Sequence, residues 1–180
     1  MTGGTGNFMA MNTTVSLTRP LKATLVHPLV VRLPVTKAAR AAFDAACQRP
    51  AGHRRRRTRA MLRLRGVPIP TTPESPVARV FVNHPAIHSK VPISDPHYVG
   101  TVAFFGSHAE HVHSHGDSTG RAGRRSSFAL DLTPALERLH RLGEPIGHSV
   151  TVQIVPVLLG GCVSECDLEV GAVELVTVGS

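Results

Sequence analysis

Residues 149–178 read SVTVQIVPVLLGGCVSECDLEVGAVELVTV, two valine-rich runs separated by GGCVSE. β-Branched residues favour extended backbone, and Gly and Ser between such runs are typical of turns. We therefore expect a strand on each side of the turn. Because the two strands are adjacent in the sequence, the pattern predicts an antiparallel pair that closes a sandwich or barrel.

Further strand-like and helix-like runs precede this pair. Apolar patterning predicts strands at 21–35, 60–69, 78–83, 98–106 and 126–132. The Ala-rich run 36–48 begins at Thr36, a good N-cap residue, and predicts a short helix. A second helix is expected from Thr133, as its N-cap, to Gly143. The predicted fold class is all-β, an antiparallel β-sandwich or barrel (jelly-roll-like) with one or two short helices.

The chain has 180 residues, of which 42% are hydrophobic, enough for one domain with its own core. Residues 1–13 are small, polar and Gly-rich and predict a flexible N-terminal arm, and 14–180 are assigned to a single β domain. The sequence contains no apolar run of the roughly eighteen residues that a membrane-spanning helix needs. We therefore expect a soluble chain without a membrane span.

The formal net charge is +8, and many of the arginines lie in two groups, at 54–65 and 121–125. Neither group alternates with the aromatic residues that stack on single-stranded nucleic acid. We therefore expect no nucleic-acid partner. The arginines are interpreted as part of solvated loops that can touch an acidic partner.

Four of the 11 histidines, His108, His111, His113 and His115, are clustered in one polar segment. In an extended chain, the alternating three would lie on one side, and neutral imidazoles bind copper, nickel or zinc. One hypothesis is therefore copper binding at this His-rich loop, and the other is a polar surface loop without a metal. Beyond this loop we expect no cofactor.

Features of an enzyme active site are scarce. The sequence has no nucleophile-elbow pattern and no phosphate-binding Gly-rich motif with its lysine, so no catalytic residues are predicted. The cysteines Cys47, Cys162 and Cys166 are too few for a disulfide framework, and spacing alone does not decide whether the last two pair.

The order of the segments is more informative than any one of them. It runs TRPLKATLVHPLVVRLP, RRRRTRAMLRLRGVPI, ARVFVNHP, HYVGTVAFFGSHAEHVHSHG, SSFALDLTPALERLHRLG, HSVTVQIVPVLLGG and LEVGAVELVTV. This series resembles the C-terminal domain of plant-type polyphenol oxidases, the tyrosinase and catechol oxidase family, from about Thr14 to Val178. Two departures are Ala78 and Arg79 in place of the family's Phe-Asp, and a His-rich loop where the family has a Lys-rich one.

The resemblance implies a β domain that covers the dicopper site of a separate catalytic domain and keeps the oxidase latent. The copper-binding histidine pattern of that catalytic domain is absent from this sequence. The resemblance therefore predicts a non-enzymatic accessory or shielding domain with a tyrosinase-type catalytic chain as its partner. It also implies a plastid or thylakoid-lumen location if the family location holds, whereas the sequence itself leaves the compartment unknown.

By position in the family pattern, either the segment HPAIHSKVPISDPH, residues 84–97, or the His-rich loop would face the partner; the alternative is that 84–97 is a surface turn with ordinary packing. Candidate partner-facing residues, which would plug the active site, are Ile87, Lys90, Val91 and Ile93. Two alternatives stay open. The chain would deliver copper from the His-rich loop, or it would be a structural subunit of a larger complex that reuses the fold.

Overall fold

The computed structural model describes residues 12–15, 21–24, 27–47, 58–68, 77–103, 125–157 and 168–179. In chain order, its elements are β1 (Asn12–Val15), β2 (Leu21–Ala23), β3 (Leu29–Pro34), α1 (Lys37–Cys47), β4 (Thr58–Pro68), β5 (Val77–Val82), β6 (Tyr98–Ala103), β7 (Arg125–Asp131), α2 (Thr133–Arg141), β8 (Ser149–Val157), β9 (Leu168–Val170) and β10 (Ala172–Gly179). The predicted strands and both predicted helices are thus confirmed. The first two residues of β1 fall in the range that the sequence assigned to the arm.

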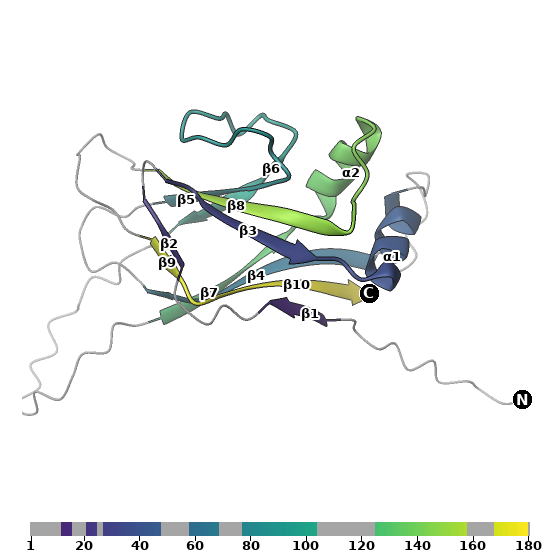
Figure 1. Cartoon of the computed structure of the whole chain (residues 1–180), viewed down its shortest axis with the longest axis horizontal. Coiled ribbons are helices and arrows are strands. Elements are labelled where there is room, and N and C mark those ends of the chain that lie inside the picture. The colour runs from purple at the N-terminus through teal and green to yellow at the C-terminus, as the bar shows by residue number, and fades with distance from the viewer. Residues whose placement is uncertain are drawn as a thin grey trace, which may run out of the picture.

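The described strands form two four-stranded sheets, and Figure 1 shows that the two sheets face each other. The β4 sheet has the order β1-β10-β4-β7, and the β8 sheet has the order β3-β8-β5-β6. The short pair β2 and β9 lies at the end of the sandwich away from the helices. Within the described residues all the ladders are antiparallel, so the predicted all-β antiparallel sandwich with two helices is confirmed.

The predicted pairing of the last two valine-rich runs is wrong. β8 pairs with β3 and β5, whereas β10 pairs with β1 and β4. Each run is therefore a central strand of its own sheet, with a neighbour on either side. Sequence adjacency failed as a guide because both runs are apolar enough to occupy a central position, and a sandwich needs such a strand in each layer.

The core lies between the two sheets, and strand alternation sets it. In β3, Leu29, Val31 and Leu33 are buried while the three residues between and after them are exposed. β4 follows the same rule, with buried Leu62 and Leu64. The other strands add further aliphatic side chains to this cluster: Ala78, Val80, Val82, Val102, Val150, Val152, Ile154, Val173 and Leu175. The low aromatic content of the chain thus gives a core built mainly from Val and Leu.

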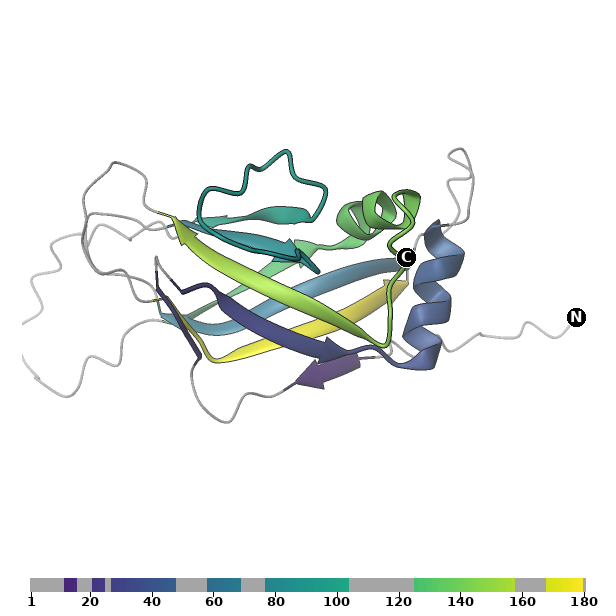
Figure 2. The same cartoon turned by 45° about the horizontal axis from the view of Figure 1, so that its top comes forward.

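The two helices lie toward one end of the sandwich, and Figure 2 shows α1 lying across that end. The Thr36 Oγ1 accepts a hydrogen bond from the Ala39 N–H at 3.1 Å, so the predicted cap of α1 is confirmed. Thr133 is not the N-cap of α2, because that position belongs to Leu132. The Thr133 Oγ1 instead accepts a hydrogen bond from the Ala60 N–H at 2.9 Å, which joins α2 to β4.

Two glycines, Gly66 in β4 and Gly171 between β9 and β10, lie close together where β4 is irregular. Gly66 has φ +65° and lies where the register between β4 and β7 shifts. The Gly171 N–H donates to the Arg65 carbonyl at 3.0 Å, and a Cβ on Gly171 would lie 3.1 Å from that oxygen. Glycine therefore suits the positive φ at position 66, and a side chain at position 171 would crowd the Arg65 carbonyl.

Replacing a core leucine of β4 tests this packing. Leu62 is fully buried, so Leu62→Ala should lower the free energy of unfolding by about 2–5 kcal/mol. Leu142 is 60% exposed, and Leu142→Ala should change it by less than about 0.5 kcal/mol. Urea denaturation of the two variants measures the difference. Equal effects would contradict the described core.

Candidate functional site

The segment between β5 and β6, residues 83–97, crosses the outer face of the β8 sheet (Figures 1 and 2). Beneath it, Phe81 and Val155 point away from the main core and are buried with Val91 of the segment in a second apolar cluster. Ile87, Tyr98 and Val157 are partly buried against this cluster. The β8 sheet is thus packed on both faces, by the other sheet on the inside and by this segment on the outside.

The segment is fixed to β8 where it leaves β5. Asn83 has φ +52°. Its N–H donates to the Thr151 carbonyl, and its side-chain oxygen accepts from the Thr151 N–H, each at 2.8 Å. The buried side chain of Gln153 accepts from the His84 N–H at 2.9 Å and donates to the His84 carbonyl at 2.6 Å. Four hydrogen bonds therefore hold two consecutive residues of the segment on the sheet.

The other end is fixed through His97. The His97 N–H donates to the Asp95 carboxylate at 2.8 Å, and its ring Nδ1 lies 2.9 Å from the Val82 carbonyl. A carbonyl only accepts, so Nδ1 carries the hydrogen. Arg138 of α2 donates to the carbonyls of Pro96 and Tyr98, which also ties this end to the helix.

Two histidine rings, those of His84 and His97, stack edge to face between the two ends, with centroids 5.2 Å apart. The His84 Nε2 lies 3.6 Å from the Asp95 carboxylate, and the His97 Nε2 lies 3.9 Å from the Glu144 carboxylate. The His84 ring also meets Phe81 edge on, at a centroid distance of 6.0 Å. The two rings thus contact Asp95 of the segment, Phe81 of β5 and Glu144 after α2, and these contacts help to hold the segment in shape.

The four predicted partner-facing residues have two different placements. Val91 is buried in the second cluster, and its carbonyl accepts from the Arg79 guanidinium at 3.3 Å. Ile87 is half-buried against the same cluster. Lys90 is exposed, and Ile93 is 60% exposed. The first two therefore anchor the segment, and the last two are presented to the surroundings.

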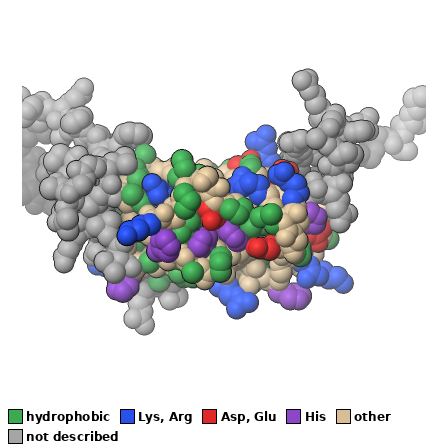
Figure 3. All heavy atoms as spheres, turned by 90° about the horizontal axis from the view of Figure 1, so that it is seen from above, with side chains coloured by type: hydrophobic (Ala, Val, Ile, Leu, Met, Phe, Trp, Pro, Cys, Tyr) green, Lys and Arg blue, Asp and Glu red, His purple; other side chains and the backbone are tan. Residues whose placement is uncertain are grey.

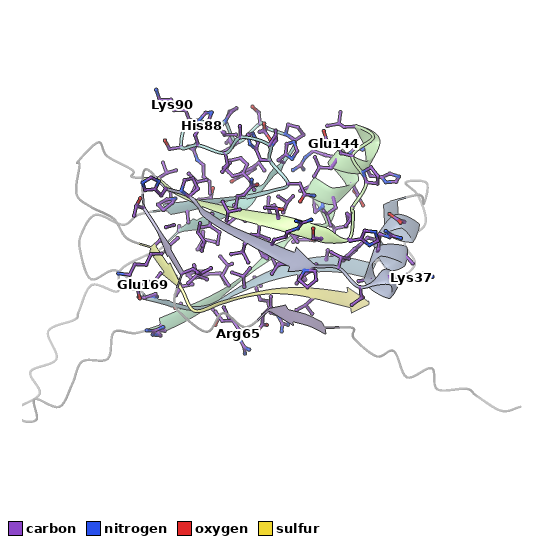
Figure 4. The ribbon with its side chains drawn as sticks, in the orientation of Figure 1. Lys37, Arg65, His88, Lys90, Glu144 and Glu169 are labelled. Carbon is purple, nitrogen blue, oxygen red and sulfur yellow. The ribbon has the colours of Figure 1, made fainter. Side chains whose placement is uncertain are left out.

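Lys90 and His88 lie on the outer side of the segment, as Figure 4 shows. Ile93 is one of three large hydrophobic residues that are exposed in the part of the chain that the structure describes. In Figure 3, which views this face, hydrophobic side chains lie among histidine and charged ones. The surface is mixed, with an apolar residue beside basic ones.

The predicted metal-binding residues His108, His111, His113 and His115 lie outside the described residues, as do Cys162 and Cys166. Copper binding there stays a prediction. Among the described residues, no group of three or more His, Cys, Asp or Glu side chains is arranged to hold a metal ion. In the same ranges, neither helix has the length and hydrophobicity to cross a membrane.

Sequence reasoning missed the role of Gln153. It is a polar residue in the middle of a valine-rich run, and that interruption was the available signal. Its partner His84 is 69 residues away, so no local pattern could have joined the two.

Comparison with solved structures finds this fold in part of a tyrosinase from apple. Latent apple tyrosinase matches with a TM-score of 0.50 and 15% identity, over 89% of this chain and 27% of that chain. A latent aurone synthase (polyphenol oxidase) from natural source matches with a TM-score of 0.49 and 19% identity, over 84% of this chain and 24% of that chain. The chain thus spans about a quarter of the length of the solved proteins that it resembles.

The likeness to apple tyrosinase defines the class of fold, an all-β domain shared with part of a polyphenol oxidase, and it confirms the predicted resemblance at the level of fold. No curated protein sequence matches the chain. The family model of DUF7868, a domain of unknown function, matches residues 13–177. The chain therefore belongs to the DUF7868 family.

Removing the Gln153 amide tests how the loop is held. Gln153→Leu keeps a similar volume but leaves the backbone N–H and carbonyl of His84 without partners. It should lower the free energy of unfolding by about 1–3 kcal/mol and speed hydrogen exchange at the His84 amide.

A matched control is Thr101→Val, which removes an exposed hydrogen bond, 2.6 Å long, to the Tyr98 hydroxyl. That change should cost less than about 1 kcal/mol. If the Gln153→Leu variant were as stable as the unchanged protein and its His84 amide exchanged hydrogen at the same rate, the hydrogen bonds from Gln153 to His84 would have no role in holding the loop.

Proposed function

We propose that this domain is a non-catalytic accessory domain that binds and covers a tyrosinase-type catalytic chain, and that residues 84–97 form the contact. The observation that carries the proposal is a loop fixed at both ends that presents Ile93 at 60% exposure. The fold supports it, because the same fold is found in part of an apple tyrosinase that is described as latent.

The way the loop is held suits a docking role. Binding is weakened when a mobile segment must be ordered, and a segment already held by hydrogen bonds avoids much of that cost. Gln153 and Asn83 hold one end, and His97 and Arg138 hold the other. Val91 fixes the middle from below. Ile93 can therefore enter a partner's cavity without rearrangement of the loop.

The chemistry of the exposed residues fits a partner with a partly apolar cavity and an acidic rim. Ile93 supplies the apolar side chain, and burying a side chain of that size contributes about 1.5–3 kcal/mol. Lys90 and His88 lie on the outer side of the loop (Figure 4) and would meet polar or acidic groups of the partner.

The contacts of the titratable side chains are consistent with an absence of catalysis in this loop. The acids that face His84 and His97 are Asp95 of the same loop and Glu144, which follows α2. Asp95 also accepts the His97 N–H. These groups therefore hold the loop in shape, as expected of a surface that binds a partner.

Copper delivery from the His-rich loop is the alternative function, and it makes a different prediction. A delivery protein would lose copper binding when His111, His113 and His115 are replaced, with Ile93 unimportant. A covering domain would depend on Ile93 and would act without bound copper.

The test is inhibition of diphenol oxidation. The purified domain is titrated into a tyrosinase-type catalytic chain from the same source, and the concentration for half inhibition is measured. Ile93→Ser should raise that concentration about tenfold or more, because the apolar contact is lost. Val30→Ser is the matched control, since Val30 is 53% exposed on β3, two strands away from β5. It should change the value less than twofold.

Two results would refute the proposal. One is that the unchanged domain leaves the oxidase rate unaffected at micromolar concentration. The other is that Ile93→Ser and Val30→Ser have the same effect, which would place the contact elsewhere or make it non-specific.

A further inference from the structure

A row of arginines lies on the outer face of the β4 sheet. In β4, Leu62 and Leu64 face the core, and the alternating Arg59, Arg63 and Arg65 face outward and are exposed. Arg125 of β7 is exposed too, and its guanidinium donates to the Gly66 carbonyl at 3.2 Å. These four arginines are called the basic face below.

The described acidic residues of this sheet face, Glu174 and Asp131, are fewer than its four arginines, so a net positive charge remains. Glu174 of β10 is buried and bonds Arg65 at 3.1 Å. Asp131 of β7 accepts a hydrogen bond from the Thr133 N–H at 2.9 Å. Arg59 and Arg63 make no hydrogen bond or ion pair through their side chains with any residue that the structure describes. The basic face therefore carries at least two guanidinium groups available to a partner.

The basic face lies on the opposite side of the sandwich from the loop at 84–97. Figure 4 shows Arg65 on the side away from Lys90 and His88, with both sheets between them. A partner on the basic face and a partner on the loop can therefore bind at the same time. The inference drawn from the basic face does not depend on the function proposed for the loop.

We propose that the basic face binds a carboxylate-rich, extended segment of a partner protein. Alternate residues of a strand recur about every 6.6–6.8 Å, and alternate Asp or Glu residues of an extended segment have the same repeat. Guanidinium groups match carboxylates with two parallel hydrogen bonds. In sequence, the run Arg54–Arg57 leads directly into β4 and adds to the positive charge of this part of the chain.

A carboxylate-rich protein segment is favoured over a nucleic acid as the partner, because the residues between the arginines are not aromatic. Described neighbours on this face include Met61, Ser127, Ala129 and Val176, none of which offers an aromatic ring for base stacking. Individual surface ion pairs contribute little, on the order of 0–1 kcal/mol. Affinity therefore requires several carboxylates in register, and this is what makes an extended acidic segment the fitting partner.

The test uses a fluorescent peptide of alternating Glu and Thr as the probe, with binding measured by fluorescence anisotropy. The variant is Arg59→Gln with Arg63→Gln, and Arg65 is kept because it pairs the buried Glu174. The matched control is Lys37→Gln with Arg141→Gln, which removes the same charge from exposed positions on the two helices. The proposal predicts that the β4 variant weakens peptide binding about tenfold and the control less than twofold.

Binding of the peptide should also weaken as salt is raised, because exposed charges are screened. Three outcomes overturn the proposal. They are no peptide binding to the unchanged protein, an equal loss in both double variants, and tighter arginine-dependent binding of oligothymidylate or of phosphatidylserine vesicles than of the peptide. The last would assign the basic face to a nucleic acid or to a lipid surface.

Discussion

Strand β8 is buried on both of its faces, and much of the arrangement of the molecule follows from that constraint. Val150, Val152 and Ile154 enter the core between the sheets, while Val155 points outward. An apolar outer face on a sheet must be covered or it exposes hydrophobic surface to water. The segment at 83–97 supplies the cover, with Val91 as its apolar contact and Gln153 of β8 as the polar group that fixes it.

The cover also explains why one side of the sandwich differs from the other. The outer face of the β8 sheet carries a loop tied at both ends, so the loop's exposed residues are held in place by the sheet below. On the outer face of the β4 sheet, by contrast, Arg59, Arg63 and Arg65 are exposed. The two faces thus have different chemistry, one mixed and apolar at Ile93, the other basic, and each suits a different partner.

Much of the fold could be predicted from the sequence, because alternation fixes which face of a strand is buried. The pattern of β4, with Leu62 and Leu64 inside and Arg63 and Arg65 outside, is an example. Strand pairing could not be predicted, since the same valine-rich pattern fits several neighbours. Within the loop, Val91 and Ile93 are similar aliphatic residues that each adjoin Pro92. Which one is buried depends on the path of the chain, including the bond from the Val91 N–H to the His88 carbonyl at 3.2 Å.

The central claim is that the loop at 84–97 is the surface that meets a tyrosinase-type catalytic chain. Hydrogen–deuterium exchange of the domain, alone and mixed with such a chain from the same source, tests it most directly. The account predicts added protection of amides within 84–97, with the amides of β4 unchanged. Protection confined to β4 and its neighbours, or no change at any amide, would contradict it.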